Sequence, residues 1–287
     1  MKKTTYLVII SIVTIITVIA GSIYHFGDVE IGWGFPWGFP WGAGNDGAKI
    51  SNTVSLDEFD TADIDMRVMD IEVVEGDEAS VHYECNKKRY EPEINVEKGV
   101  LYIKQKKNKK SDHYGNVKCR MMLVVPENTN FKKFTISNNT GDVKITGLEL
   151  DVLSIDADTG DLKLNDCKSG KTEIDNDTGD VKLTDCSLGD CNIDNDTGDV
   201  ELTDCHFGIP GGDMKISNDT GDIDVEGCDD LYLYETDFST DIGEVTVNGK
   251  EVKGRHYTES AVLESNLDNI RKFTIKTDIG DVTVDQK

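Results

Sequence analysis

The sequence predicts an all-β protein: a parallel β-solenoid with coils of about 19 residues, preceded by one N-terminal transmembrane helix. Two observations carry this prediction. A motif centred on Thr-Gly-Asp recurs along the second half of the chain, and each copy is followed by alternating apolar and polar residues, as in a strand with one buried face. The composition agrees, because 27 glycines, only 5 prolines and abundant Thr, Asp and Asn favour short strands and tight turns.

The first segment, residues 1–24, is expected to be a membrane anchor or a signal peptide. Lys2 and Lys3 precede an apolar run from Tyr6 to Ile23, which is about long enough to cross a bilayer as a helix. The basic flank places the N-terminus inside the cell and the C-terminal domain outside, as a single-pass protein of the cell membrane. A secretory signal has the same pattern, and Val18-Ile19-Ala20 resembles a cleavage site, so secretion after cleavage is the alternative.

Residues 25–48 form a juxtamembrane linker rich in Gly, Pro and Trp. The stretch WGFPWGFPWG, Trp33 to Gly42, holds all three tryptophans of the chain. Gly and Pro disfavour regular structure there, and aromatic rings beside a membrane span prefer the level of the lipid headgroups. A low-complexity spacer is the other interpretation.

Residues 49–135 predict an N-terminal β region of the solenoid without a repeated motif. Alternating strands are expected at Ile64–Val68, Ile71–Val73, Ser80–Tyr83, Val100–Lys104 and Cys119–Val125. The basic stretch Lys104–His113 is expected to be the tip of a hairpin, or else a contact for an anionic polymer.

Residues 136–287 hold the Thr-Gly-Asp repeats. The copies begin at Ile136, Ile155, Ile174, Ile193, Ile216, Phe238 and Ile275; the first four are spaced by 19 residues and the later ones by 23, 22 and 37. A unit of this size buries too few side chains to be stable alone, so the copies are expected to stack and to place like residues on like. The expected apolar ladders are Ile155, Ile174, Ile193 and Ile216; Leu162, Val181, Val200 and Ile223; and Leu164, Leu183, Leu202 and Val225.

The cysteines follow the same register. Cys167, Cys186, Cys205 and Cys228 fall at one place in consecutive units and predict a column of buried thiols that pack as small apolar groups. Disulfides between coils and a metal site are the alternatives. Cys85, Cys119 and Cys191 have no assigned partner, and the seven cysteines match neither a zinc motif nor a disulfide framework.

The turn glycines, such as Gly179, are expected at positive φ, where a side chain would cost about 1 kcal/mol. The Asn-x-Thr sequons at Asn138, Asn176, Asn195 and Asn218 are attributed to the turn motif and not to glycosylation.

Stacking also aligns carboxylates along one edge. We expect a column formed by Asp142, Asp161, Asp180, Asp199 and Asp222, followed by Glu244 and Asp281. Stacked like charges repel, and turn hydrogen bonds, lysines such as Lys144, Lys163 and Lys182, or bound Ca²⁺ could offset the repulsion. The pattern fits neither an EF-hand nor a calcium-binding β-roll, so a solvated acidic edge is the alternative to a cation site. No other cofactor is predicted.

The order of motifs also resembles a known family. FDTADIDMRVMDIEVVEGDEASVHYE, EINVEKGVLYIKQK and MMLVVPENTNFKKFTISNNTGDV, followed by Thr-Gly-Asp repeats, are similar to the bacterial putative-adhesin family of β-strand-repeat proteins of unknown function. The resemblance covers about residues 49 to 287. It implies a β-solenoid on the outer face of a membrane, and it implies no catalytic residues.

The function predicted from the sequence is a non-enzymatic, extracellular, membrane-tethered module with an adhesive, binding or structural role at the cell envelope. Its partners are the membrane, through Tyr6 to Ile23, and an envelope polymer or surface protein. The net charge of -25 argues against contact of the folded part with nucleic acid or anionic lipid. A Ca²⁺-dependent binder of surface polymers is the first alternative, and a carbohydrate-active enzyme the second. The segment Asn248–Lys272 is expected to cap the solenoid or bind a partner, with a short helix within Thr258–Asn269.

Overall fold

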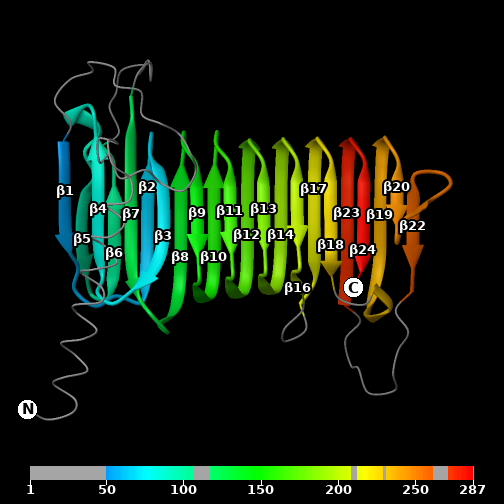
Figure 1. Ribbon diagram of the computed structural model, residues 1–287, viewed down its shortest axis with the longest axis horizontal. Coiled ribbons are helices and arrows are strands. Elements are labelled where there is room, and N and C mark those ends of the chain that lie inside the picture. Colours follow the sequence, from blue (N-terminus) through cyan, green and yellow to red (C-terminus); the bar gives the residue numbers. More distant parts are fainter. Residues whose placement is uncertain (1–49, 107–116, 208–211, 229–230, 261–270, 287) are drawn as a thin grey trace, which may run out of the picture. The chain divides into compact units, whose positions relative to one another are not determined.

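The protein forms a β-solenoid in the part of the chain that the structure describes. The computed structural model describes residues 50–106, 117–207, 212–228, 231–260 and 271–286. Its strands lie in one compact unit, Gly47–Lys287. Two sheets, A and B, face each other, and each coil contributes one strand to each sheet (Figure 1). The predicted all-β parallel solenoid is therefore confirmed for this unit.

The spatial order of the strands defines the two sheets. Sheet A consists of β1 (Ile50–Ser55), β4 (Ser80–Cys85), β7 (Cys119–Pro126), β3 (Asp70–Gly76), β9 (Val143–Thr146), β11 (Leu162–Asn165), β13 (Val181–Thr184), β15 (Val200–Thr203), β18 (Ile223–Cys228), β24 (Val282–Gln286), β20 (Val245–Val247) and β21 (Lys250–Glu251). Sheet B consists of β22 (His256–Glu259), β19 (Tyr234–Ile242), β23 (Arg271–Ile279), β17 (Met214–Thr220), β14 (Ser187–Thr197), β12 (Lys168–Thr178), β10 (Glu149–Ala157), β8 (Asn130–Asn138), β2 (Thr61–Met66), β6 (Val100–Lys104) and β5 (Glu93–Glu97). β16 (His206–Phe207) pairs with β14, and two 3-10 turns are η1 (Lys88–Tyr90) and η2 (Leu231–Leu233).

The predicted apolar ladders form the core. In sheet B, Ile155 pairs with Ile174, which pairs with Ile193, and Ile216 follows. The two predicted ladders of sheet A have the same parallel register. The core is wider than three ladders, because the longest strands of sheet B reach 11 residues and turn further side chains inward. These include the buried Thr172.

The cysteine column is confirmed. The thiols of Cys167, Cys186, Cys205, Cys228 and also Cys191 are buried and form no disulfide. Each column thiol lies at or just after the C-terminal end of a sheet A strand. The Sγ of Cys186 donates to the carbonyl of Thr184 at 3.3 Å. Burial raises the pKa of Cys191. These thiols therefore pack as small apolar groups with local hydrogen bonds.

The order of the last coils differs from the expected order. The final repeat of the sequence, β23 and β24, lies between the coil of β17 and β18 and the coil of β19 and β20 (Figure 1). Asp281 is thus next to Asp222, and Glu244 is the last member of the column. Identical motifs present the same edges, so a long connection allows the last copy to insert between two earlier ones.

The first coils show the same arrangement. The coil of β2 and β3 stacks on that of β8 and β9, and β6 and β7 lie outside it although they come later in the sequence. Antiparallel strands close both ends, with β5, β4 and β1 at one end and β21 and β22 at the other. Such strands cover the open edges of the terminal coils.

Among the expectations for connecting segments, one needs correction and others fall on residues that the structure does not describe. The short helix expected within Thr258–Asn269 is wrong at its start, because Thr258 and Glu259 belong to β22 and pair with β19. Residues 261–270 lie outside the described residues, as does most of the basic stretch after Lys104. Within the described ranges no helix is long and apolar enough to cross a membrane. The predicted span Tyr6 to Ile23 lies outside these ranges.

Candidate binding surfaces

The Thr-Gly-Asp turn is held by a column of buried asparagines. Asn195 is 0% exposed; its Nδ2 donates to the carbonyl of Gly198 at 3.0 Å and to Oδ1 of Asn218 at 3.2 Å. Asn176 makes the same bonds to Gly179 and Asn195. All four sequon asparagines are buried, so their amide groups serve the turns and are not accessible acceptors in the folded protein.

The predicted carboxylates form one column along the turn edge. The acidic column consists of Asp70, Asp142, Asp161, Asp180, Asp199, Asp222, Asp281 and Glu244. Oδ1 of each aspartate accepts a hydrogen bond from the backbone N–H of the next member, at 2.8 to 3.2 Å. The carboxylates therefore bind neighbouring coils together, and this bonding offsets part of their mutual repulsion.

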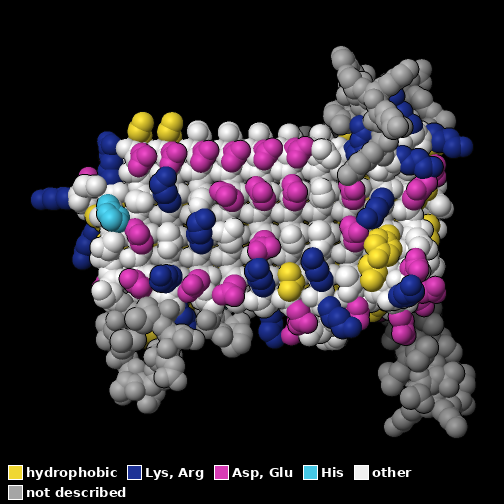
Figure 2. All heavy atoms as spheres, turned by 180° about the vertical axis from the view of Figure 1, so that it is seen from behind, with side chains coloured by type: hydrophobic (Ala, Val, Ile, Leu, Met, Phe, Trp, Pro, Cys, Tyr) yellow, Lys and Arg dark blue, Asp and Glu magenta, His cyan; other side chains and the backbone are white. Residues whose placement is uncertain are grey.

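Lysines on sheet A neutralise part of the acidic surface. Lys144 bonds Glu72 at 3.2 Å, Lys163 lies 3.6 Å from Asp161, and Lys182 contacts Glu201 at 2.5 Å. Rows of Asp and Glu side chains remain visible across the stacked coils (Figure 2).

A second acidic row lies on the outer face of sheet B. Asp156, Asp175 and Asp194 occupy one register position in three consecutive coils. Loss of hydration in the stack raises the pKa of Asp175, and the like charges of Asp156 and Asp194 raise it further.

The cation site predicted at the acidic column has the carboxylates but not a clustered ligand set. Among the residues that the structure describes, no group of three or more His, Cys, Asp or Glu side chains is arranged to hold a metal ion. One oxygen of each column aspartate is already an acceptor for an amide of the next coil. Cation binding thus stays a prediction that only direct measurement decides.

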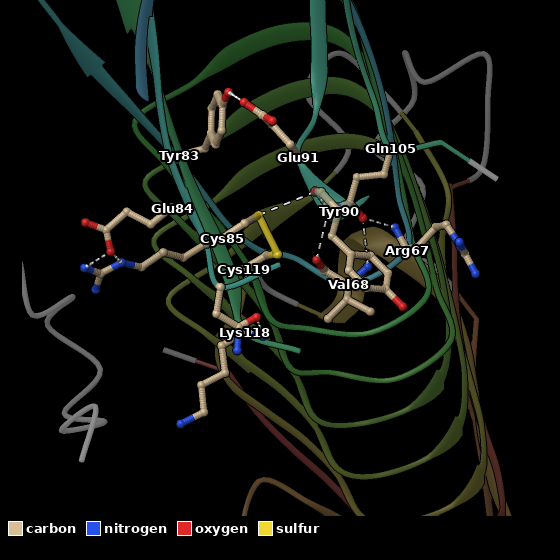
Figure 3. Close-up of a disulfide and its surroundings, with 12 residues drawn as sticks. Arg67, Val68, Tyr83, Glu84, Cys85, Tyr90, Glu91, Gln105, Lys118 and Cys119 are labelled. Carbon is tan, nitrogen blue, oxygen red and sulfur yellow. Dashed lines mark hydrogen bonds and ion pairs between the residues drawn. A yellow bond between two sulfur atoms is a disulfide. The ribbon is translucent and has the colours of Figure 1, made fainter. Parts of the chain in front are cut away.

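A disulfide at the N-terminal cap corrects the sequence interpretation. Cys85 of β4 and Cys119 of β7, two cysteines without an assigned partner, are bonded to each other (Figure 3). They are directly opposite in an antiparallel pair, a register that sequence spacing does not reveal. Beside the bond, the ring of the buried Tyr90 lies under the guanidinium of Arg89, with 4.9 Å between Cζ and the ring centroid.

Positive side chains gather at this cap. We define the basic rim as Lys87, Lys88, Arg89, Lys106 and Lys118, which lie where β4 and β6 end and β7 begins. Lysine and arginine side chains are concentrated at that end of the unit (Figure 2). Sequence reasoning missed the rim because its members come from three separate segments.

Asp70, the first member of the acidic column, was also missed. It precedes Ile71 and Val73, which stack on Val143 and Ile145. The signal was present in the sequence, because Asp70-Ile71-Glu72-Val73 has the same alternation as the residues after each Thr-Gly turn.

Comparison with known proteins agrees with this architecture. The family model described as Toastrack DUF4097 matches residues 59–209 and 109–285. No curated protein matches the chain.

Several solved structures are similar to the chain. One is a putative cell adhesion protein from Clostridium sporogenes, at 16% identity and a TM-score of 0.40 over 84% of this chain and 100% of that one. Another is a putative adhesin from Bacteroides fragilis, at 12% identity and 0.40 over 82% and 96%. A third is a putative lipid binding protein from Parabacteroides distasonis, at 13% identity and 0.43 over 84% and 98%. Similarity at this level carries no argument about function.

Proposed function

This chain belongs to the Toastrack DUF4097 family, as its sequence motifs predicted, and we propose that it is a non-enzymatic, extracellular β-repeat module tethered to the cell membrane. Its role would be adhesive, binding or structural at the cell envelope. The proposed tether is the segment Tyr6 to Ile23, with the C-terminal domain outside; secretion after cleavage is the alternative topology.

One observation carries this proposal: the recurring polar side chains are used to join coils. The asparagine column bonds the turn carbonyls, and the aspartates of the acidic column bond the backbone of the next coil. A catalytic pair of carboxylates would be a singular departure from the repeat, whereas these residues recur in every coil. The recurring surface therefore supports a scaffold or a multivalent binding face.

The disulfide supports an extracellular location. Cys85 and Cys119 are bonded, and such bonds persist mainly in oxidising compartments outside the cytosol. The remaining five cysteines are buried and form no disulfide in the structure.

The test is a topology measurement on the full chain in bacterial cells. A C-terminal tag that external protease removes from intact cells, on a full-length product that sediments with membranes, is the expected result. A tag protected until the cells are lysed would refute the extracellular location. A shortened product in the medium would show that the N-terminal segment is a cleaved signal and not an anchor.

The second candidate, a Ca²⁺-dependent polymer binder, is favoured by one observation only, the alignment of carboxylates in neighbouring coils. Calcium titration of residues 47–287, with Mg²⁺ as the control, tests it. A rise in the unfolding temperature that Ca²⁺ causes and chelator reverses would support this candidate; identical curves would exclude it.

A further inference from the structure

The basic rim reverses the charge of the protein at one place. Its five cations outnumber the two carboxylates that follow Tyr90 in the sequence, Glu91 and Glu93, in a chain whose net charge is -25. Lys106 contacts Glu93 at 2.7 Å, and Glu91 accepts from the hydroxyl of Tyr83 at 2.7 Å. Lys88, Arg89, Lys106 and Lys118 are all exposed. The rim therefore presents a net positive surface to solvent.

The rim is held on a braced frame. The disulfide joins β4 to β7, and beyond it the N–H of Asn86 donates to the carbonyl of Lys118 at 3.0 Å. The N–H of Lys118 donates back to Oδ1 of Asn86 at 3.0 Å. These bonds fix the backbone of Lys118 beside the segment that carries Lys87.

Gln105 holds the other half of the frame (Figure 3). Its buried side chain donates to the carbonyls of Tyr90, at 2.5 Å, and Val68, at 3.2 Å. Its Oε1 accepts from the N–H of Arg67 at 2.8 Å. The turn that carries Lys88 and Arg89 is thereby attached to the residues after β2, so the backbone segments that carry the cations are held together.

The chain enters the unit at this rim. Ile50, the first residue of β1, is opposite Cys85, which is opposite Cys119. The covalent connection to the predicted membrane span is thus made where the positive charge is concentrated. The acidic column extends away from the cap by about 4.8 Å per coil, so most of it lies beyond the Debye length of about 8 Å.

We propose that the basic rim docks on the anionic lipid headgroups of the membrane that holds the predicted span. This inference rests on the proposed tethered, extracellular topology, and it differs from the expectation, drawn from net charge, that the folded part avoids anionic lipid. Each lysine near such a surface contributes about 1 kcal/mol, or roughly fivefold in affinity. Docking would hold the N-terminal cap of the stack at the bilayer.

The test is sedimentation of residues 47–287, which contain the described strands and core, with vesicles. Vesicles of phosphatidylcholine with about one third phosphatidylglycerol, an anionic lipid, are compared with vesicles of phosphatidylcholine alone. We expect binding to the anionic vesicles only, weakened by salt. The triple variant Lys87→Gln, Lys88→Gln and Lys118→Gln should bind roughly 100-fold more weakly.

A matched variant at the opposite end makes the experiment specific. Lys250→Gln, Lys253→Gln and Lys272→Gln remove the same charge from exposed positions and should change binding by less than about twofold. An equal loss in both variants, or no binding to anionic vesicles, would overturn the proposal. Binding to a soluble polyglycerol phosphate but not to the vesicles would overturn it in favour of an envelope polymer.

The full chain provides a second measurement. In reconstituted bilayers, amide hydrogen exchange of residues 86–90 should slow only when phosphatidylglycerol is present, and the rim variant should abolish this difference. Exchange that is independent of lipid charge, in a protein with confirmed extracellular topology, would refute docking and leave the proposed function intact.

Discussion

The turn glycine Gly179 offers the sharpest test of the stacked architecture. Its φ is 140°, a conformation that side-chain-bearing residues rarely adopt. A Cβ at this position would lie 2.1 Å from the carbonyl oxygen of Gly160 in the preceding coil, and 2.6 Å from its carbon. Contacts below 3.0 Å are essentially absent from proteins, so the coils would have to separate.

The magnitude follows from two additive effects. Backbone strain at a glycine-only conformation costs about 1–3 kcal/mol, and overpacking against a rigid neighbour costs about 1–3 kcal/mol. Gly179→Ala should therefore destabilise the unit by roughly 2–6 kcal/mol, above the cost of about 1 kcal/mol expected from conformational preference alone.

Gly249→Ala is the matched control. Gly249 also has a positive φ, of 66°, but nothing lies within 4 Å of an added Cβ. This variant should lose about 1 kcal/mol. Urea denaturation of residues 47–287, monitored by circular dichroism, gives the midpoint for both variants, and an unchanged m-value allows each midpoint shift to be converted to a loss of stability. Equal midpoints for the two variants would refute close stacking of the turns.

Three further outcomes are expected. Removal of the disulfide by Cys85→Ser with Cys119→Ser should lower the free energy of unfolding by about 3–4 kcal/mol, because the bond closes a loop between residues 34 positions apart. Thiol titration of the denatured wild type should find two more thiols with reductant than without it, and equal counts would exclude the bond. Asn195→Ala should cost about 2–4 kcal/mol because it leaves buried turn groups unpaired, whereas the exposed Asp196→Ala should stay within about 0.5 kcal/mol; similar losses would contradict the asparagine column. The raised pKa of Asp175 means that the folded state binds this proton more tightly than the unfolded state does, so the group adds stability as pH falls from 7 through its folded pKa towards about 4. Asp175→Asn should reduce that rise in a pH series of melting temperatures. An unchanged slope would show that the pKa of Asp175 is not raised in the folded protein.

Much of the core could be predicted from the sequence because the repeat itself encodes its partners. Successive copies separated by 19 residues leave no spare chain, so each copy can stack only on the next one. Ile155, Ile174 and Ile193 therefore meet in register, and the column cysteines follow. The candidate acidic column was predictable for the same reason, apart from Asp70 and the order of its last two members.

The role of the carboxylates needed the three-dimensional structure. Sequence alone left turn hydrogen bonds, lysines and cations as alternative ways to offset their repulsion. The backbone geometry shows that each aspartate from Asp70 to Asp281 accepts an amide of the neighbouring coil. Such a bond depends on how far each turn is shifted relative to the turn of the next coil, and the spacing of residues along the sequence does not specify this shift.

What the sequence determined by itself was the coil: its length, its inward ladders and its glycine turn. Only the tertiary structure decided how coils are ordered where connections are long, because every copy presents an equivalent edge. The 37 residues between the last two copies let β23 and β24 insert between earlier coils. The antiparallel cap likewise brings Cys85 to Cys119 and assembles the basic rim from three distant segments, since pairing across the cap depends on strand direction and register.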